Sequence, residues 1–76
     1  MKIEEYAKNA LVNYGAILPN WGVEIIEIGN LPGSDWADVT CFITRPKCRK
    51  PYVSWTLRMN MVRQITDFSR STFTKL

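Results

Sequence analysis

The sequence has no histidine among its 76 residues. This absence excludes the Ser-His and Cys-His pairs of many hydrolases and removes the most common metal-binding side chain. A phosphate-binding loop is also missing, because Gly29 and Gly33 are not followed by the Lys-Ser or Lys-Thr pair that such loops use. We therefore predict that the protein is not an enzyme and holds no metal or other cofactor.

Cysteine is scarce, with only Cys41 and Cys48 in the chain. Two cysteines are too few for the disulfide scaffold of a small secreted protein. The first five residues include two acids where a signal peptide would be apolar, and no apolar run approaches the ~18 residues of a membrane span. These features predict a cytoplasmic protein with reduced thiols, in which Cys41 packs in the core and Cys48 is a bystander in a basic loop.

Residues 3–14 carry the clearest helical pattern of the sequence. Their apolar side chains recur at steps of three and four, which places them on one face of a helix. Gly15 follows the last of them, where a C-terminal cap is expected. The chain is short enough that we predict one domain, residues 1–76. We expect the helix to dock through Tyr6, Ala10 and Leu11.

Alternating apolar residues predict strands after the helix. The alternation at 21–28 slips near Ile25 and Ile26, which indicates a β-bulge. A turn is expected at 29–34 and a loop at 45–51, where two prolines bracket the sequence. The predicted strands are 21–28, 36–44 and 52–59.

The C-terminal segment favours a second helix over about 60–70, with Asn60 as its N-terminal cap and a frayed tail at 71–76. The predicted fold is therefore α+β, a small three-stranded antiparallel sheet with an N-terminal and a C-terminal helix (α-β-β-β-α), in which the helices cover one face and the other face is partly open. This order is similar to the topology of double-stranded-RNA-binding domains. However, Asn60-Met-Val-Arg-Gln stands where that family has a Lys-rich motif, and the first hairpin turn has no histidine. The sequence is assigned to no family.

Four acidic residues flank the first hairpin turn, and two carboxylates close together could bind a divalent cation or do acid–base work. Their spacing follows no known ligand loop, so a solvated hairpin rim is the preferred interpretation. The four are Glu24, Glu27, Asp35 and Asp38.

Charge is divided unevenly along the chain. Residues 1–44 hold two cations and six acids, a net charge of −4, whereas residues 45–76 hold eight cations and one acid, a net charge of +7. Four of the cations lie at 45–50, in the proline-bracketed loop. Such a split indicates an interaction surface on the later half, although basic residues that only face solvent would give the same pattern.

Aromatic residues predict where this surface extends. The strand alternation places Trp36, Phe42 and Tyr52 on the sheet face opposite the N-terminal helix, unless the C-terminal segment covers them. A sheet face of this kind beside a basic loop can stack bases or dock a protein. The predicted partner-binding residues are Arg45, Lys47, Arg49, Lys50, Tyr52, Phe42, Trp36 and Arg58.

Two functions remain. The first is a non-catalytic protein-binding module, such as a small inhibitor or adaptor that acts on a larger partner, as small proteins of phages and mobile elements often do. The second is a nucleic-acid-binding protein that uses the same loop and aromatic face. A net charge of only +3 and the acidic first hairpin argue against broad contact with phosphates, so we expect a protein partner.

Overall fold

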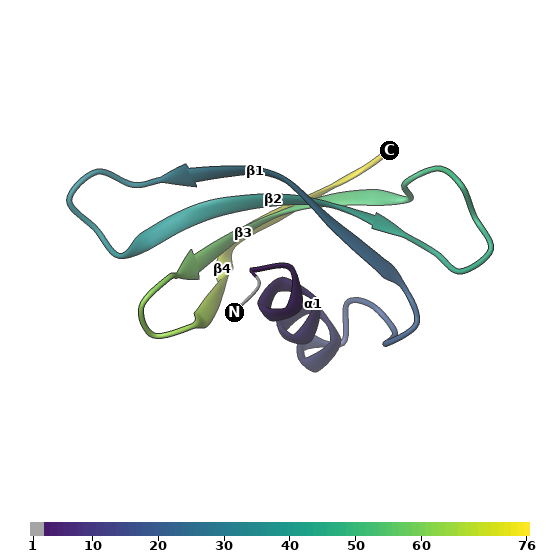
Figure 1. The fold of residues 1–76 in the computed structure, drawn as a ribbon, viewed down its shortest axis with the longest axis horizontal. Coiled ribbons are helices and arrows are strands. Elements are labelled where there is room, and N and C mark those ends of the chain that lie inside the picture. Colours follow the sequence, from purple (N-terminus) through teal and green to yellow (C-terminus); the bar gives the residue numbers. More distant parts are fainter. Residues whose placement is uncertain (1–2) are drawn as a thin grey trace.

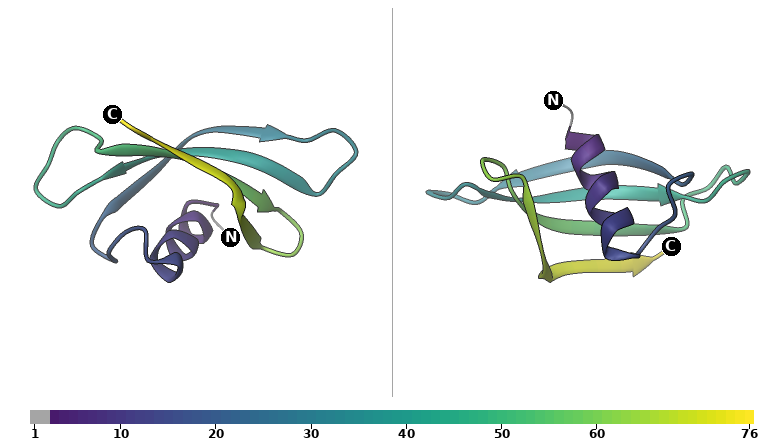
Figure 2. Two further views of the ribbon diagram at one scale, coloured as in Figure 1. Left: turned by 180° about the vertical axis from the view of Figure 1, so that it is seen from behind. Right: turned by 90° about the horizontal axis from the view of Figure 1, so that it is seen from below.

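The computed structural model describes residues 3–76, which form one helix and one four-stranded antiparallel sheet (Figure 1). The strands follow the order β1-β2-β3-β4, so each pairs with the next along the chain. The helix lies across one face of the sheet, and the other face is open (Figure 2). The elements are α1 (Ile3–Tyr14), β1 (Gly22–Asn30), β2 (Trp36–Thr44), β3 (Val53–Asn60) and β4 (Ile65–Lys75).

The predicted C-terminal helix and three-stranded sheet are wrong, because residues 65–75 form a fourth strand paired with β3. Asn60 therefore caps no helix, although its Oδ1 accepts hydrogen bonds from the N–H groups of Val62 (3.1 Å) and Arg63 (2.8 Å) in the turn between β3 and β4. The turn ends at Gln64, whose φ of 61° redirects the chain back along β3. With this correction the likeness to the topology of double-stranded-RNA-binding domains is lost.

The α1 helix ends as its sequence predicts. Gly15 has a φ of 88° and donates its N–H to the carbonyl of Val12 (3.0 Å), and Ala16 donates to Leu11 (2.9 Å). This pair of hydrogen bonds is a Schellman motif, which satisfies carbonyls that the helix end leaves free. The cap reverses the chain, and the connection that follows ends at Trp21, immediately before β1.

The predicted bulge in β1 is confirmed. The pairing with β2 shifts between Ile25 and Glu27, which leaves Ile26 as the extra residue. A larger irregularity divides β4, because the residues paired with Thr56 and Arg58 are Thr72 and Asp67. The strand therefore bulges at residues 68–71, and this bulge allows Phe68 to pack against the core.

The core lies between α1 and the covered face of the sheet. Alternate residues of β2 are fully buried there, as the alternation of 36–44 predicts. The helix contributes Ala7 and Leu11. Residues 3–76 contain no helix that is long and apolar enough to cross a membrane. The buried apolar side chains are Ala7, Leu11, Ile17, Ala37, Val39, Cys41, Ile43, Val53, Leu57 and Met59.

Candidate functional site

The structure divides the predicted partner-binding residues between the two ends of the sheet. The loop 45–51 projects from the end at which β1 starts and β4 finishes (Figure 1). Trp36 and Arg58 lie toward the opposite end, beside the turns that follow β1 and β3. Phe42 lies on the open face at the loop end, where it pairs with Ser54. The eight predicted residues therefore do not form one surface.

The open face of the sheet is polar, and Arg58 on this face is paired with an acid. Arg58 and Asp38 are cross-strand partners, and the guanidinium donates to the carboxylate at 2.5 Å and 3.4 Å. This hydrogen bond raises the pKa of Arg58 above its usual value. Beside them, the hydroxyl groups of Thr40 and Thr56 form a hydrogen bond of 3.2 Å. Arg58 is therefore already neutralised by Asp38 and is not free to bind an anionic partner.

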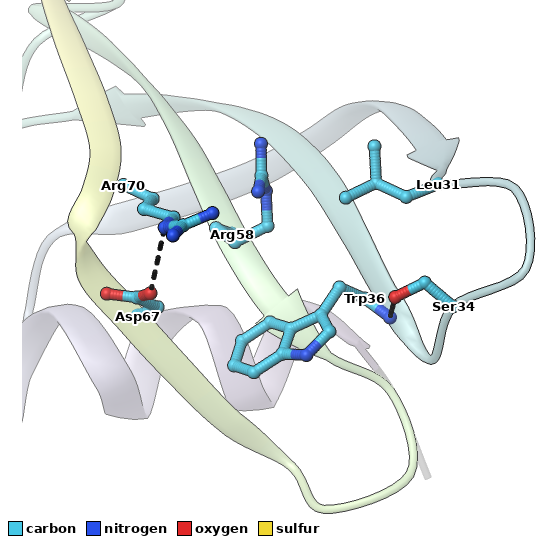
Figure 3. A pocket seen from close by; sticks show the side chains of 6 residues that line it. All are labelled: Leu31, Ser34, Trp36, Arg58, Asp67 and Arg70. Carbon is cyan, nitrogen blue, oxygen red and sulfur yellow. Dashed lines mark hydrogen bonds and ion pairs between the residues drawn. The ribbon is translucent and has the colours of Figure 1, made fainter.

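A hollow of about 380 Å³ opens on this face (Figure 3). Arg58 lies between Leu31 on one side and the ion pair of Asp67 with Arg70 (3.7 Å) on the other. Hydrogen bonds from Ser69 lower the pKa of Asp67, so this carboxylate stays ionised beside Arg70. Each arginine of the hollow is thus already paired with an acid, which leaves little charge for a ligand. The lining residues are Leu31, Ser34, Trp36, Arg58, Asp67 and Arg70.

Tyr52 does not lie on the open face, and this part of the predicted surface is wrong. Its N–H donates to the carbonyl of Ile43 (2.7 Å), although Ile43 is already the ladder partner of Val53. The regular alternation of β3 therefore begins only at Val53. Tyr52 packs on the helix side, against the core and edge-to-face with Trp21 (ring centroids 6.0 Å apart).

The displaced Tyr52 belongs to a second hollow, of about 540 Å³, which we name the aromatic hollow. Its walls come from the end of α1, the connection to β1, the start of β3 and the end of β4. Phe73 lies 5.2 Å from Trp55 between ring centroids and remains 63% exposed, and Tyr14 is 59% exposed. The lining residues are Tyr14, Ala16, Trp21, Tyr52, Val53, Trp55, Phe73 and Lys75.

The basic loop (residues 45–51) adjoins the aromatic hollow through Tyr52. The guanidinium of Arg45 lies 4.0 Å from the centre of the Tyr52 ring, and Lys75 Nζ lies 5.8 Å from it. A further hollow of about 510 Å³ opens beside the loop, and Tyr52 lines both hollows. This loop hollow is lined by Arg45, Cys48, Arg49, Lys50, Pro51, Tyr52 and Leu76.

The electrostatics of these two adjoining hollows differ from those of the open face. Four cations line them, and no acidic side chain does. Within residues 3–76, the cations of the basic loop form no ion pair. The charge at this end of the molecule is therefore available to a partner. The four lining cations are Arg45, Arg49, Lys50 and Lys75.

The acids of the first hairpin do not face one another. Glu24 pairs with Phe42, Glu27 with Thr40 and Asp38 with Gly29 across the ladder. Among the described residues, 3–76, no group of three His, Cys, Asp or Glu side chains could hold a metal ion. The hairpin acids thus decorate the open face and the rim of the turn.

The two thiols differ in accessibility, and we expect them to differ in reactivity. Both are free, Cys41 is buried and Cys48 is exposed in the basic loop. Burial raises the pKa of the Cys41 thiol to about 11. A thiol reagent should modify Cys48 in the native protein and Cys41 only after denaturation. Mass spectrometry of the labelled protein measures both rates, and rapid labelling of both thiols would contradict the placement of Cys41 in the core.

The sequence did not identify most of the aromatic hollow. Tyr14, Trp21, Trp55, Phe73 and Lys75 were absent from the predicted site, although four of them are large aromatics. The one available signal was the spacing of Phe73 and Lys75, which share a face if 65–75 is a strand. Comparisons with known protein families, with curated proteins and with solved structures find no match to this chain.

Proposed function

We propose that this protein is a non-catalytic protein-binding module that docks an acidic region of a larger partner on the aromatic hollow and the basic loop. The observation that carries the proposal is their junction at Tyr52, which lines both hollows beneath Arg45. A partner that covers this ring covers both surfaces at once. An inhibitor or adaptor acts through such a docking surface alone and needs no catalytic group.

The chemistry of the surface supports a protein partner. Tyrosine, tryptophan and arginine are the residues that most often dominate the energy of protein interfaces. In this protein the half-buried rings of the aromatic hollow lie beside the cations of the basic loop, which form no ion pair among residues 3–76. A protein interface commonly has this arrangement of an apolar centre and a polar rim. Because cations and no acidic side chains line the two hollows, the surface favours a partner of negative charge. Attraction between opposite charges speeds association with such a partner, and repulsion between like charges disfavours a basic one.

Single-stranded nucleic acid is the second candidate, because exposed rings beside cations also stack bases. The pairing of Arg58 with Asp38 on the open face and the net charge of only +3 favour it less, since phosphate contact normally uses a continuous basic surface. We expect no binding of mixed single- and double-stranded nucleic acids at micromolar protein and 50 mM salt. Tight binding, with a slope of log K against log salt of about −0.9 for each phosphate contacted, would instead establish the second candidate.

Once a partner has been identified, alanine variants test whether it docks on the aromatic hollow and the basic loop. Tyr52→Ala should weaken binding of a protein partner by about 2 kcal/mol or more, because it removes a central anchor. Replacing Lys47, Arg49 and Lys50 together by Ala should act mainly on the association rate. Val62→Ala, at the opposite end of the sheet and 68% exposed, is the matched control and should leave affinity unchanged. Equal losses for Tyr52→Ala and Val62→Ala would contradict the proposal.

A further inference from the structure

The outer side of β4 is a free sheet edge next to the aromatic hollow. β4 is the last strand of the sheet, and no segment of residues 3–76 pairs with its outer side (Figure 2). The N–H of Leu76 donates to the carbonyl of Tyr52 (3.1 Å), on the inner side. Because backbone groups alternate in direction along a strand, those of Thr74 also point toward β3, and those of Phe73 and Lys75 point outward.

The side chains of the same two residues face the helix side of the sheet. Phe73 is the cross-strand partner of Trp55, and Lys75 is the partner of the buried Val53. Both line the aromatic hollow. A strand added outside β4 would therefore place every second side chain over this hollow, at intervals of about 7 Å.

The two edges of the sheet are not equivalent. The β1 edge is interrupted by the bulge at Ile26, which discourages pairing with another strand, and it carries Glu24 and Glu27, which would repel an acidic segment. The first part of β4 is separated from the rest by the bulge at residues 68–71. A regular, cationic edge remains only at residues 72–75, beside the basic loop.

We propose that an extended acidic segment of the partner adds a short strand to β4 at residues 72–75. One large apolar side chain of the segment enters the aromatic hollow, and acidic side chains two residues along the same face meet Lys75 and the basic loop. In this mode main-chain hydrogen bonds supply affinity and the pockets for alternate side chains supply specificity. The inference rests on the proposed function and names the form in which the partner binds.

The test uses random twelve-residue peptides displayed for selection on the intact chain. Enriched peptides should be acidic, with a large apolar residue two positions from an acid. Addition of the best of them should slow the amide hydrogen exchange of Phe73 and Lys75, measured by nuclear magnetic resonance, because these N–H groups gain acceptors. The amide of Thr74 is the internal control and should not change.

A pair of variants at one position tests the same hydrogen bond. Lys75→Ala removes the ammonium and keeps the outward N–H, whereas Lys75→Pro removes the N–H as well without breaking an inner ladder bond. The selected peptide should bind Lys75→Pro about three- to tenfold more weakly than Lys75→Ala. Thermal unfolding of both variants checks that the sheet is intact. The amide-exchange measurement uses the unmodified chain and so tests the inference even if a variant fails to fold.

The outcomes distinguish the inference from the function on which it rests. Peptides that lose binding in Tyr52→Ala, yet leave the exchange of Phe73 and Lys75 unchanged, would overturn strand addition and retain the docking surface. Failure to enrich acidic peptides would also overturn strand addition. Concentration-dependent protection of both amides without any peptide would show instead that a second copy of the chain covers this edge.

Discussion

The Leu11→Asp variant is expected to be unfolded at room temperature. Leu11 is completely buried in the core cluster between α1 and the sheet. The substitution removes a large apolar side chain, which alone costs about 2–5 kcal/mol, and places an unpaired carboxylate in an apolar site at a further cost. A domain has only about 5–15 kcal/mol of stability in total, and one of this size has a thin margin.

Asn9→Asp provides the matched control, because it adds the same charge to the same helix at an exposed position. Substitutions at exposed sites usually change stability by less than about 0.5 kcal/mol. Thermal unfolding followed by far-ultraviolet circular dichroism compares both variants with the parent. A Leu11→Asp protein that melts with the parent would show that α1 does not dock on the sheet through this residue.

The features that the sequence predicted well are those set by local pattern. The helical stripe of α1, its glycine cap and the slip at Ile26 each depend on residues that are neighbours in the chain. The alternation in β2 identified its buried face, because successive side chains point to opposite faces of the sheet and α1 covers only one of them. For these elements the tertiary structure agrees with the local preference.

The C-terminal segment could not be assigned in this way. Residues 60–68 have apolar spacings that suit a helix, and Asn60 makes the hydrogen bonds of a helix cap. A strand is favoured because residues 65–75 pair along the edge of β3 and because their β-branched threonines suit a strand. A bulge then brings Phe68 to the core, where it stacks on Tyr14 with ring centroids 3.9 Å apart.

The candidate site depended on that same segment. The basic loop was evident from composition, but the aromatic hollow combines the ends of α1 and β4 with the start of β3. Phe73 and Lys75 lie near Trp55 only because residues 65–75 form a strand that pairs with β3, so a fold without this strand could not locate them there. The shift of Tyr52 to the helix side follows from an irregular hydrogen bond at the start of β3, which no alternation pattern can reveal.

Contact with the partner at the aromatic hollow should be close enough to form a covalent cross-link. A benzophenone-bearing phenylalanine analogue can replace Phe73, which is 63% exposed at the rim of the hollow. The same analogue at Val62, 68% exposed in the turn at the other end of the sheet, is the control. Replacing Lys47, Arg49 and Lys50 by Ala in the position-73 protein should reduce its cross-linking, because the loop attracts the partner.

The most direct test of the docking surface is therefore photo-cross-linking from positions 73 and 62 in the native cell, with the products identified by mass spectrometry. From position 73 we predict one prominent adduct, in which the cross-linked peptide belongs to an acidic region of a protein. From position 62 we predict that this adduct does not form. Adducts to nucleic acid alone, or the same products from both positions, would contradict the proposal that the aromatic hollow and the basic loop bind a protein.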